Sequence, residues 1–217
     1  MAVPRMFIVA GPPGAGKSSF FELSGVADHV FNADDRAAEL NAGSYENIPT
    51  AVRATVNREF EEFVHVNIRA GTSFALETTL RSTITFEQAK LAKKNGFHVF
   101  MFYVALDTVE HHIERVMRRA ARGGHSASES TLRRIHASSL GNLPAALNPD
   151  RSGIDIVQIY DNSQAENRPR LVLEARRGRI VGLADSFPEW LQHALGWTRG
   201  DLDLRRQEAM RRFGAKE

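Results

Sequence analysis

The sequence contains no cysteine, and this absence removes several classes of chemistry. A chain without cysteine has no disulfide framework, no cysteine-ligated zinc site and no thiol nucleophile. It also has no apolar run near the ~20 residues that a membrane-spanning helix needs. The first apolar run is short and does not give a signal-peptide pattern. We therefore expect a cytoplasmic protein without a membrane partner.

A strong excess of charge of one sign is also missing, because 28 basic and 26 acidic residues leave a net charge of +2. Nucleic-acid-binding surfaces usually combine concentrated basic charge with interleaved aromatic side chains. The sequence does not show that combination, so we expect no nucleic-acid partner. The 217 residues, 42% of them hydrophobic, are enough for one domain with a substantial core.

Apolar runs alternate with helical patterns, and this alternation predicts the fold. Five runs rich in Val, Ile and Phe are typical of strands buried on both faces of a parallel sheet. The predicted strands are Met6–Ala10, His29–Phe31, Ser73–Glu77, Phe97–Leu106 and Ile154–Tyr160. The predicted helices are Lys17–Ser24, Ala51–Ala70, Thr83–Asn95, Thr108–Ala121 and Glu129–Leu147. This pattern indicates an α/β protein, a three-layer α/β/α fold around a mainly parallel five-stranded sheet.

The C-terminal part has a different pattern. Two short apolar runs, Leu171–Ala175 and Arg179–Leu183, flank a turn and predict a β-hairpin. A short helix is expected at Phe187–Leu195. We therefore divide the chain into a domain of residues 1–198 and a charged helical tail of residues 199–217. A tail of this composition is usually a solvated helix, and a partner-binding helix is the alternative.

Residues Gly11–Ser18, GPPGAGKS, match the phosphate-binding P-loop pattern G-x-x-x-x-G-K-[ST] between a predicted strand and a predicted helix. The glycines let the backbone wrap closely around phosphates with its N–H groups pointing inward. Lys17 would reach the β- and γ-phosphates, and the Ser18 hydroxyl would hold Mg²⁺. The predicted nucleotide-binding residues are Gly11, Gly14, Ala15, Gly16, Lys17, Ser18 and Ser19.

A P-loop alone fits GTPases, motor ATPases and kinases. The N-K-x-D sequence that reads guanine is absent, and no apolar run ends in the Asp-Glu pair of motor ATPases. Asp107 and Asp161 each end an apolar run and could each take the magnesium-binding position of such a strand. The competing interpretation is that each carboxylate caps the following helix or turn. The absence of the guanine-reading and motor-ATPase signatures leaves a kinase as the favoured class.

Two carboxylates follow predicted strands, at the edge where open α/β sheets bind ligands. Asp34 comes after the second strand, where a kinase needs a base that accepts a hydroxyl proton. Its structural alternative is the N-cap of the next helix, a role that Asp35 could also fill. Glu77 ends the third strand, close to Thr79 and Arg81, and would bind the acceptor. The alternative for Glu77 is a salt bridge with Arg81.

Four arginines precede the pair Gly123-Gly124 within about two helical turns. They are Arg115, Arg118, Arg119 and Arg122. Guanidinium groups suit a transferring phosphoryl group, and a glycine hinge would let a lid close and exclude water. We therefore predict a lid at about residues 115–130, with a solvated basic helix face as the alternative.

In their order and spacing, these residues resemble the zeta-toxin family of P-loop kinases, in particular its short bacterial members. The resemblance runs from about Met6 to Ser163 and rests on several motifs. They are the P-loop, Asn32–Asp35, Leu76–Thr79, Arg122–His125, Arg133-Arg134, Ser138–Leu143 and Tyr160–Ser163. It implies an ATP- and Mg²⁺-dependent kinase. In the best-known members the acceptor is the 3′-hydroxyl of the amino sugar in UDP-N-acetylglucosamine, and the product blocks peptidoglycan synthesis.

The resemblance also implies roles for particular residues. Lys17 and Ser18 would bind nucleotide and metal, Asp34 would be the base, and Glu77 would hold the acceptor together with Thr79 and Arg81. Arg115 matches a phosphate-stabilising arginine at the start of the lid. A second lid arginine of the larger toxins falls near His125, which we assign to the substrate, with Arg122 as the candidate replacement. An antitoxin protein is a candidate partner. The alternatives are a P-loop kinase of another small acceptor and an ATP-gated partner-binding protein.

Overall fold

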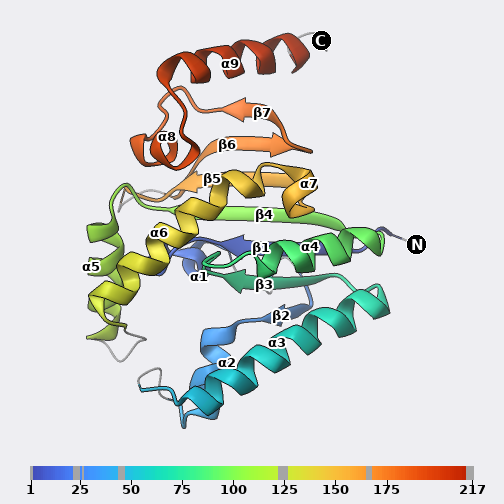
Figure 1. The fold of residues 1–217 in the computed structure, drawn as a ribbon, viewed down its shortest axis with the longest axis vertical. Helices are drawn as coiled ribbons and strands as arrows, with labels where there is room; N and C mark the ends of the chain where they lie inside the picture. The colour runs from blue at the N-terminus through green and yellow to red at the C-terminus, as the bar shows by residue number, and fades with distance from the viewer. Residues whose placement is uncertain are drawn as a thin grey trace.

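The computed structural model describes residues 2–21, 25, 27–43, 47–121, 127–164 and 168–213. Within these ranges, the strands form one sheet in the order β2-β3-β1-β4-β5-β6-β7 (Figure 1). The strands are β1 (Arg5–Ala10), β2 (His29–Phe31), β3 (Phe74–Thr78), β4 (His98–Ala105), β5 (Ile156–Asp161), β6 (Arg170–Arg176) and β7 (Arg179–Leu183). β1 to β5 pair in parallel, whereas β6 and β7 are antiparallel.

This arrangement confirms the predicted α/β fold with a mainly parallel sheet and a C-terminal hairpin. The sheet is larger than predicted, because β6 pairs antiparallel with β5 and β7 pairs with β6. The hairpin therefore extends the parallel sheet from five strands to seven within the described residues. The predicted strand bounds agree with the observed ones to within two residues.

The helices of the described residues follow the predicted alternation. They are α1 (Lys17–Phe20), α2 (Ala33–Leu40), α3 (Thr50–Ala70), α4 (Ile84–Lys94), α5 (Val109–Ala120), α6 (Glu129–Ala146), α7 (Pro149–Ser152), α8 (Glu189–Leu195) and α9 (Arg199–Phe213). The first helix is shorter than the predicted Lys17–Ser24, because the backbone is already extended at Phe21. Residues 22–24 of that prediction lie outside the described ranges. In the part of the chain that the structure describes, none of the helices is both long and apolar enough to cross a bilayer.

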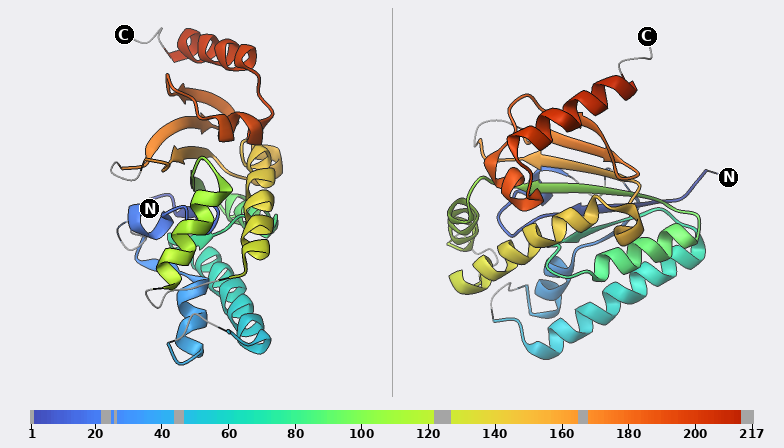
Figure 2. Two further views of the ribbon diagram at one scale, coloured as in Figure 1. Left: turned by 90° about the vertical axis from the view of Figure 1, so that its left-hand side faces the viewer. Right: turned by 45° about the horizontal axis from the view of Figure 1, so that its top comes forward.

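The main hydrophobic core lies between one face of the sheet and the helices α3, α4, α6 and α8. Figure 2 shows α3, α4 and α6 together on one side of the sheet. The other face carries a smaller cluster, in which Phe7, Val9 and Ala75 pack with Phe21 and Ala27 from the chain after the P-loop. The core thus fixes the strands, and the carboxyl ends of the parallel strands β1 to β5 meet at one edge.

The tail helix α9 packs against the outermost strand, β7 (Figure 1). Leu202 is 6% exposed, and the Arg206 guanidinium donates hydrogen bonds to the carbonyls of Ala184 and Asp185. The Arg205 guanidinium lies 4.2 Å from the centre of the Trp197 ring. The first half of the tail is therefore attached to the domain, while the division at residue 198 stays a prediction.

A buried hydrogen bond between β4 and α6 gives a test of this packing. The hydroxyls of Tyr103 and Ser139 lie 3.0 Å apart, both side chains are fully buried, and burial raises the pKa of Tyr103. Ser139→Ala leaves the phenol without a partner, so we expect the free energy of unfolding to fall by about 1–3 kcal/mol. Adding Tyr103→Phe removes the unpaired group and should recover most of that loss. Urea unfolding measures the free energy of unfolding of the single and double variants. If the losses of the two single variants simply add in the double variant, the hydroxyls of Tyr103 and Ser139 are not coupled.

Candidate nucleotide and acceptor site

The P-loop follows β1 and ends in the first turn of α1, as the motif requires. Its glycines are in close contact with other elements. A Cβ on Gly14 would lie 2.4 Å from the backbone carbonyl oxygen of His112 in α5. A Cβ on Gly16 would lie 2.5 Å from the side-chain nitrogen of Asn162, just after β5, and 3.9 Å from Nη1 of Arg115. Glycine is favoured at these two positions because both have a left-handed φ, 78° and 87°, and at Gly14 the backbone of α5 also leaves no room for a side chain.

Lys17 is folded against the loop and is 6% exposed. Its Nζ donates hydrogen bonds to the carbonyls of Gly11 at 3.0 Å and Pro12 at 3.2 Å. The same atom lies 3.5 Å from Oε1 of Glu77. The ion pair of Glu77 is thus with Lys17, so the alternative of a Glu77–Arg81 salt bridge is wrong. The other carboxylate oxygen of Glu77, Oε2, is buried and accepts no hydrogen bond from the described residues.

The strand register brings the other predicted carboxylate to the same edge. Val9 pairs with Glu77, Ala10 with Thr78, and Phe31 with Leu76. β2 therefore ends one position before Glu77, and the chain turns there into α2, which carries Asp34. In Figure 1 the helices α1, α2 and α5 all lie along this edge of the sheet.

The N-cap of α2 is Asn32, which corrects the alternative of an Asp34 or Asp35 cap. The Asn32 side chain accepts hydrogen bonds from the amides of Asp34 at 3.0 Å and Asp35 at 3.4 Å. Asp34 is exposed, and among the described residues no partner contacts its carboxylate. Because Asn32 caps the helix, the Asp34 carboxylate is available to a substrate.

The segment after β3 is held in an unusual conformation. Leu80 has a φ of 55°, a left-handed value that a leucine rarely adopts. Its amide donates to Oγ1 of Thr78 at 3.1 Å, and its carbonyl accepts from the Asn142 side chain in α6 at 2.9 Å. Thr79 is half-buried and Arg81 is exposed on either side of this residue. The two predicted acceptor residues therefore lie on a segment that α6 holds in place.

Of the predicted lid arginines, Arg115 lies beside the P-loop. Its Nη2 donates to the carbonyl oxygen of Asn162 at 3.0 Å. The Asn162 side chain in turn donates to the carbonyl of Ala15 at 2.8 Å. This chain of hydrogen bonds connects α5, the end of β5 and the loop.

Of the other predicted lid arginines, Arg118 and Arg119 lie within the described residues, and neither shows a contact with the loop there. Arg118 pairs with Glu114 on the same helix, and Arg119 is exposed. Arg122, Gly123-Gly124 and His125 lie outside the described residues, so the hinge and the two remaining site assignments stay predictions. Asp107 accepts from the Thr108 amide at 2.9 Å, whereas Asp161 accepts from the Trp190 indole at 3.3 Å. Asp161 also accepts from the Ser163 amide at 3.3 Å, as the turn-capping interpretation predicts. The N-cap of α5 is Thr108, so the capping interpretation is wrong for Asp107.

Three contacts of the site come from residues to which reasoning from residue types assigned no role: His112, Asn142 and Asn162. Asn142 and Asn162 fall within two of the motifs that carry the family resemblance, Ser138–Leu143 and Tyr160–Ser163. His112 falls in none of them and has no sequence signal beyond its place one helical turn before Arg115.

A metal at this edge would have to be held by oxygen atoms. No group of three or more His, Asp or Glu side chains gathers anywhere in the described ranges. Mg²⁺ usually takes one or two protein oxygens and completes its shell with water and substrate phosphates. The exposed hydroxyl of Ser18, in the first turn of α1, fits that requirement.

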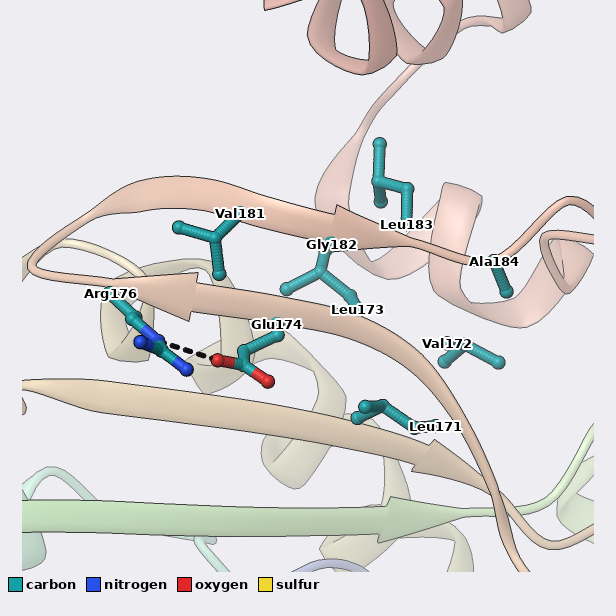
Figure 3. A pocket seen from close by; sticks show the side chains of 9 residues that line it. All are labelled: Leu171, Val172, Leu173, Glu174, Arg176, Val181, Gly182, Leu183 and Ala184. Carbon is teal, nitrogen blue, oxygen red and sulfur yellow. Dashed lines mark hydrogen bonds and ion pairs between the residues drawn. The ribbon is translucent and has the colours of Figure 1, made fainter. Parts of the chain in front are cut away.

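A hollow of about 460 Å³ lies elsewhere, over the hairpin strands β6 and β7 (Figure 3). Apolar side chains such as Leu171 and Val181 line it, together with Glu174 and Arg176. The Glu174 carboxylate is already bonded to Arg176 at 2.7 Å and to Gln158 at 3.0 Å. The one carboxylate of this hollow is therefore already paired, so it does not point to a ligand.

Solved structures of similar fold support this architecture. The PezAT chromosomal toxin–antitoxin system of Streptococcus pneumoniae aligns with a TM-score of 0.61 at 15% identity, over 99% of this chain and 87% of that one. The AvrRxo1-ORF1:-ORF2 structure with ATP aligns with a TM-score of 0.63 at 13% identity, over 96% of this chain and 64% of that one. At these identities the likeness shows the fold alone.

Sequence comparison adds a relative and a family. An uncharacterized protein of Haemophilus influenzae is 27% identical over 130 residues, which are 59% of this chain and 90% of that protein. The family model described as Zeta toxin matches residues 2–167, which include the P-loop, Asp34, Glu77 and Arg115. This chain therefore belongs to the zeta toxin family of P-loop kinases and is a phosphotransferase.

Proposed function

We propose that this protein transfers the γ-phosphate of ATP to a hydroxyl of a nucleotide sugar, with UDP-N-acetylglucosamine as the first candidate acceptor. The observation that carries the proposal is the gathering of the P-loop, Lys17, Glu77 and the Asp34 segment at one edge of the sheet. ATP as the donor is supported by the family and by the related AvrRxo1 structure with ATP. The choice of a nucleotide sugar rests on the family resemblance.

In this proposal each residue has a separate task. The P-loop amides and Lys17 bind the β- and γ-phosphates, and Arg115 stabilises the negative charge of the group in transfer. The Asp34 carboxylate accepts the proton of the acceptor hydroxyl and orients its oxygen toward the γ-phosphate. Glu77 and the segment with Thr79 and Arg81 bind the acceptor. Arg122 and His125 remain the proposed lid contacts.

Ser18 would hold Mg²⁺ together with the phosphates. The ion, when bound, would neutralise charge on the β- and γ-phosphates. Its donor set here is a hydroxyl and phosphate oxygens, which suits Mg²⁺ better than a transition metal.

The proposal is tested by incubating the protein with γ-labelled ATP, Mg²⁺ and a panel of nucleotide sugars. We expect mass spectrometry to find UDP-N-acetylglucosamine carrying one added phosphoryl group, and fragmentation to place it on the 3′-hydroxyl. A chelator of divalent metals should stop the reaction. If another sugar is phosphorylated, the kinase assignment holds and the acceptor is corrected. If ATP binds and no acceptor in a broad panel turns over, the ATP-gated partner-binding alternative is favoured.

An antitoxin-like partner is a second element of the proposal. The PezAT structure comes from a toxin–antitoxin system, and AvrRxo1-ORF1 was solved together with ORF2. We propose that a protein partner of this kind regulates the kinase. Co-expression with the product of a neighbouring reading frame and co-purification would support this, and a chain that is harmless to its host without such a partner would argue against it.

A further inference from the structure

A buried histidine connects the P-loop to the helix that carries Arg115. His112 lies in α5, one helical turn before Arg115, and is 2% exposed. Its Nε2 accepts a hydrogen bond from the Leu106 amide at 3.0 Å. Its Nδ1 lies 2.9 Å from the carbonyl oxygen of Pro13 in the P-loop. The ring thus bridges the end of β4 and the loop.

These two contacts fix the tautomer of the ring. The amide of Leu106 can only donate, so Nε2 must be an acceptor without a proton. The proton of the neutral ring is therefore on Nδ1, which donates it to the Pro13 carbonyl. Burial lowers the pKa of His112 to about 3, with added repulsion from His136, Lys17 and Arg115, while the bond to Pro13 opposes the shift. The ring is consequently neutral over the physiological pH range.

A hydrogen bond to the Pro13 carbonyl sets the orientation of the Pro13–Gly14 peptide group in the P-loop. Pro12 and Pro13 have no N–H, so Gly14 provides the first amide after Gly11 that can donate to a phosphate. The Pro13–Gly14 peptide is planar and trans, so its C=O and N–H point in opposite directions. A carbonyl held on the His112 side therefore turns the Gly14 N–H away from α5.

The backbone of α5 also contacts the P-loop, at Gly14. The carbonyl oxygen of His112 lies 2.4 Å from the place where a Cβ on Gly14 would be, and Val116 lies 3.2 Å from it. The loop and α5 are therefore in direct contact at Gly14. A shift of α5 would move the Pro13–Gly14 peptide and Arg115 together.

The geometry points to His112 as a positioning residue of the nucleotide site, whose neutral Nδ1–H orients the Pro13–Gly14 peptide of the P-loop and links it to Arg115. This inference rests on the proposed function only in taking ATP or ADP as the ligand of the loop. His112 itself would touch neither the nucleotide nor the acceptor.

Two substitutions separate the two hydrogen bonds of the ring. Asparagine at 112 places an amide N–H close to the position of Nδ1 and keeps the bond to Pro13. Glutamine places an amide oxygen close to the position of Nε2 and keeps the bond to Leu106. Both lose the ring, so both should lower the melting temperature to a similar degree. We expect His112→Gln to weaken Mg·ADP binding about tenfold, and His112→Asn less than threefold, because only the former loses the loop contact.

Titration calorimetry with Mg·ADP and no acceptor measures these affinities. His111→Asn is the matched control, since His111 is an exposed neighbour that pairs with Asp107 and should leave the affinity unchanged. Equal affinities for the Asn and Gln variants would overturn the inference. Because no acceptor is present, this result is independent of which hydroxyl the enzyme phosphorylates.

A measurement on the unchanged protein covers the case in which a variant does not fold. In ¹⁵N-resolved NMR of the histidine rings, we expect His112 to be an Nδ1–H tautomer that does not titrate between pH 5 and 8. Adding Mg·ADP should shift its Nδ1 signal more than that of exposed His111. An Nε2–H tautomer, or an Nδ1 signal that ignores the nucleotide, would overturn the inference. If Mg·ADP fails to bind the parent protein, the proposed function fails, and the tautomer still tests the contact with Pro13.

Discussion

Replacing Asp34 with asparagine is expected to lower kcat about 10³-fold while the Kd for ATP stays within about twofold of the parent value. A general base contributes about 10²–10⁴ to the rate, and an amide cannot accept the proton. The Asp34 carboxylate has no protein partner in the described part of the chain, and Asn32 already caps α2. The substitution should therefore leave stability almost unchanged. Single-turnover kinetics with a saturating acceptor, together with calorimetric ATP binding, measure both quantities.

Asp35→Asn is the matched control for this prediction. Asp35 is the next residue in the same first turn of α2, and its amide is bonded to the same Asn32 side chain. The substitution removes the same charge from almost the same place, so long-range electrostatic effects should be similar. We expect Asp35→Asn to keep most of the activity. Equal losses in both variants would mean that charge near the N-terminus of α2 matters, and that Asp34 is not the base.

The fold was predictable where the signal is local. Continuous apolar runs between turns located the strands to within two residues, because a strand buried on both faces needs an unbroken apolar sequence. The pairing of the hairpin with β5 was not predictable in the same way. Whether β6 joins the sheet depends on contacts such as Ile159 with Leu173, which no local pattern specifies. The early end of α1 at Phe21 is likewise set by packing against Phe102 and Tyr160.

In the functional site, too, the contiguous motif was predictable and the long-range contacts were not. The P-loop was recognisable because its residues are contiguous and the chemistry demands glycine, lysine and a hydroxyl at fixed spacing. The partner of Glu77 was open between Arg81 and a ligand, and the structure gives Lys17 at the start of α1, 60 positions away in the chain and 3.5 Å away in space. His112 and Pro13 are 99 positions apart, and Asn142 and Leu80 are 62 apart. Contacts of this range are determined by tertiary packing.

The Lys17–Glu77 pair carries the second large expected effect. Lys17→Met keeps the length of the stem and removes the charge, so we expect kcat/KM for ATP to fall about 10²–10³-fold, the cost of removing a charged donor from a phosphoryl-transfer site. The structure adds a second consequence. Oε2 of Glu77 has no partner among the residues that the structure describes, and Lys17→Met removes the partner of Oε1 as well. The resulting unpaired carboxylate should lower the free energy of unfolding by about 1–3 kcal/mol.

Glu77→Gln separates these two consequences. In the double variant Lys17→Met with Glu77→Gln, no buried charge is left unpaired, so most of the lost stability in urea should return. The affinity for ATP should stay as low as in Lys17→Met, because the amide does not replace a cation beside the phosphates. Glu77→Gln alone should bind ATP within about threefold of the parent and raise the KM of the acceptor. If the double variant recovers ATP affinity together with stability, then Lys17 supports the loop only by neutralising Glu77, and its assignment to the phosphates is wrong.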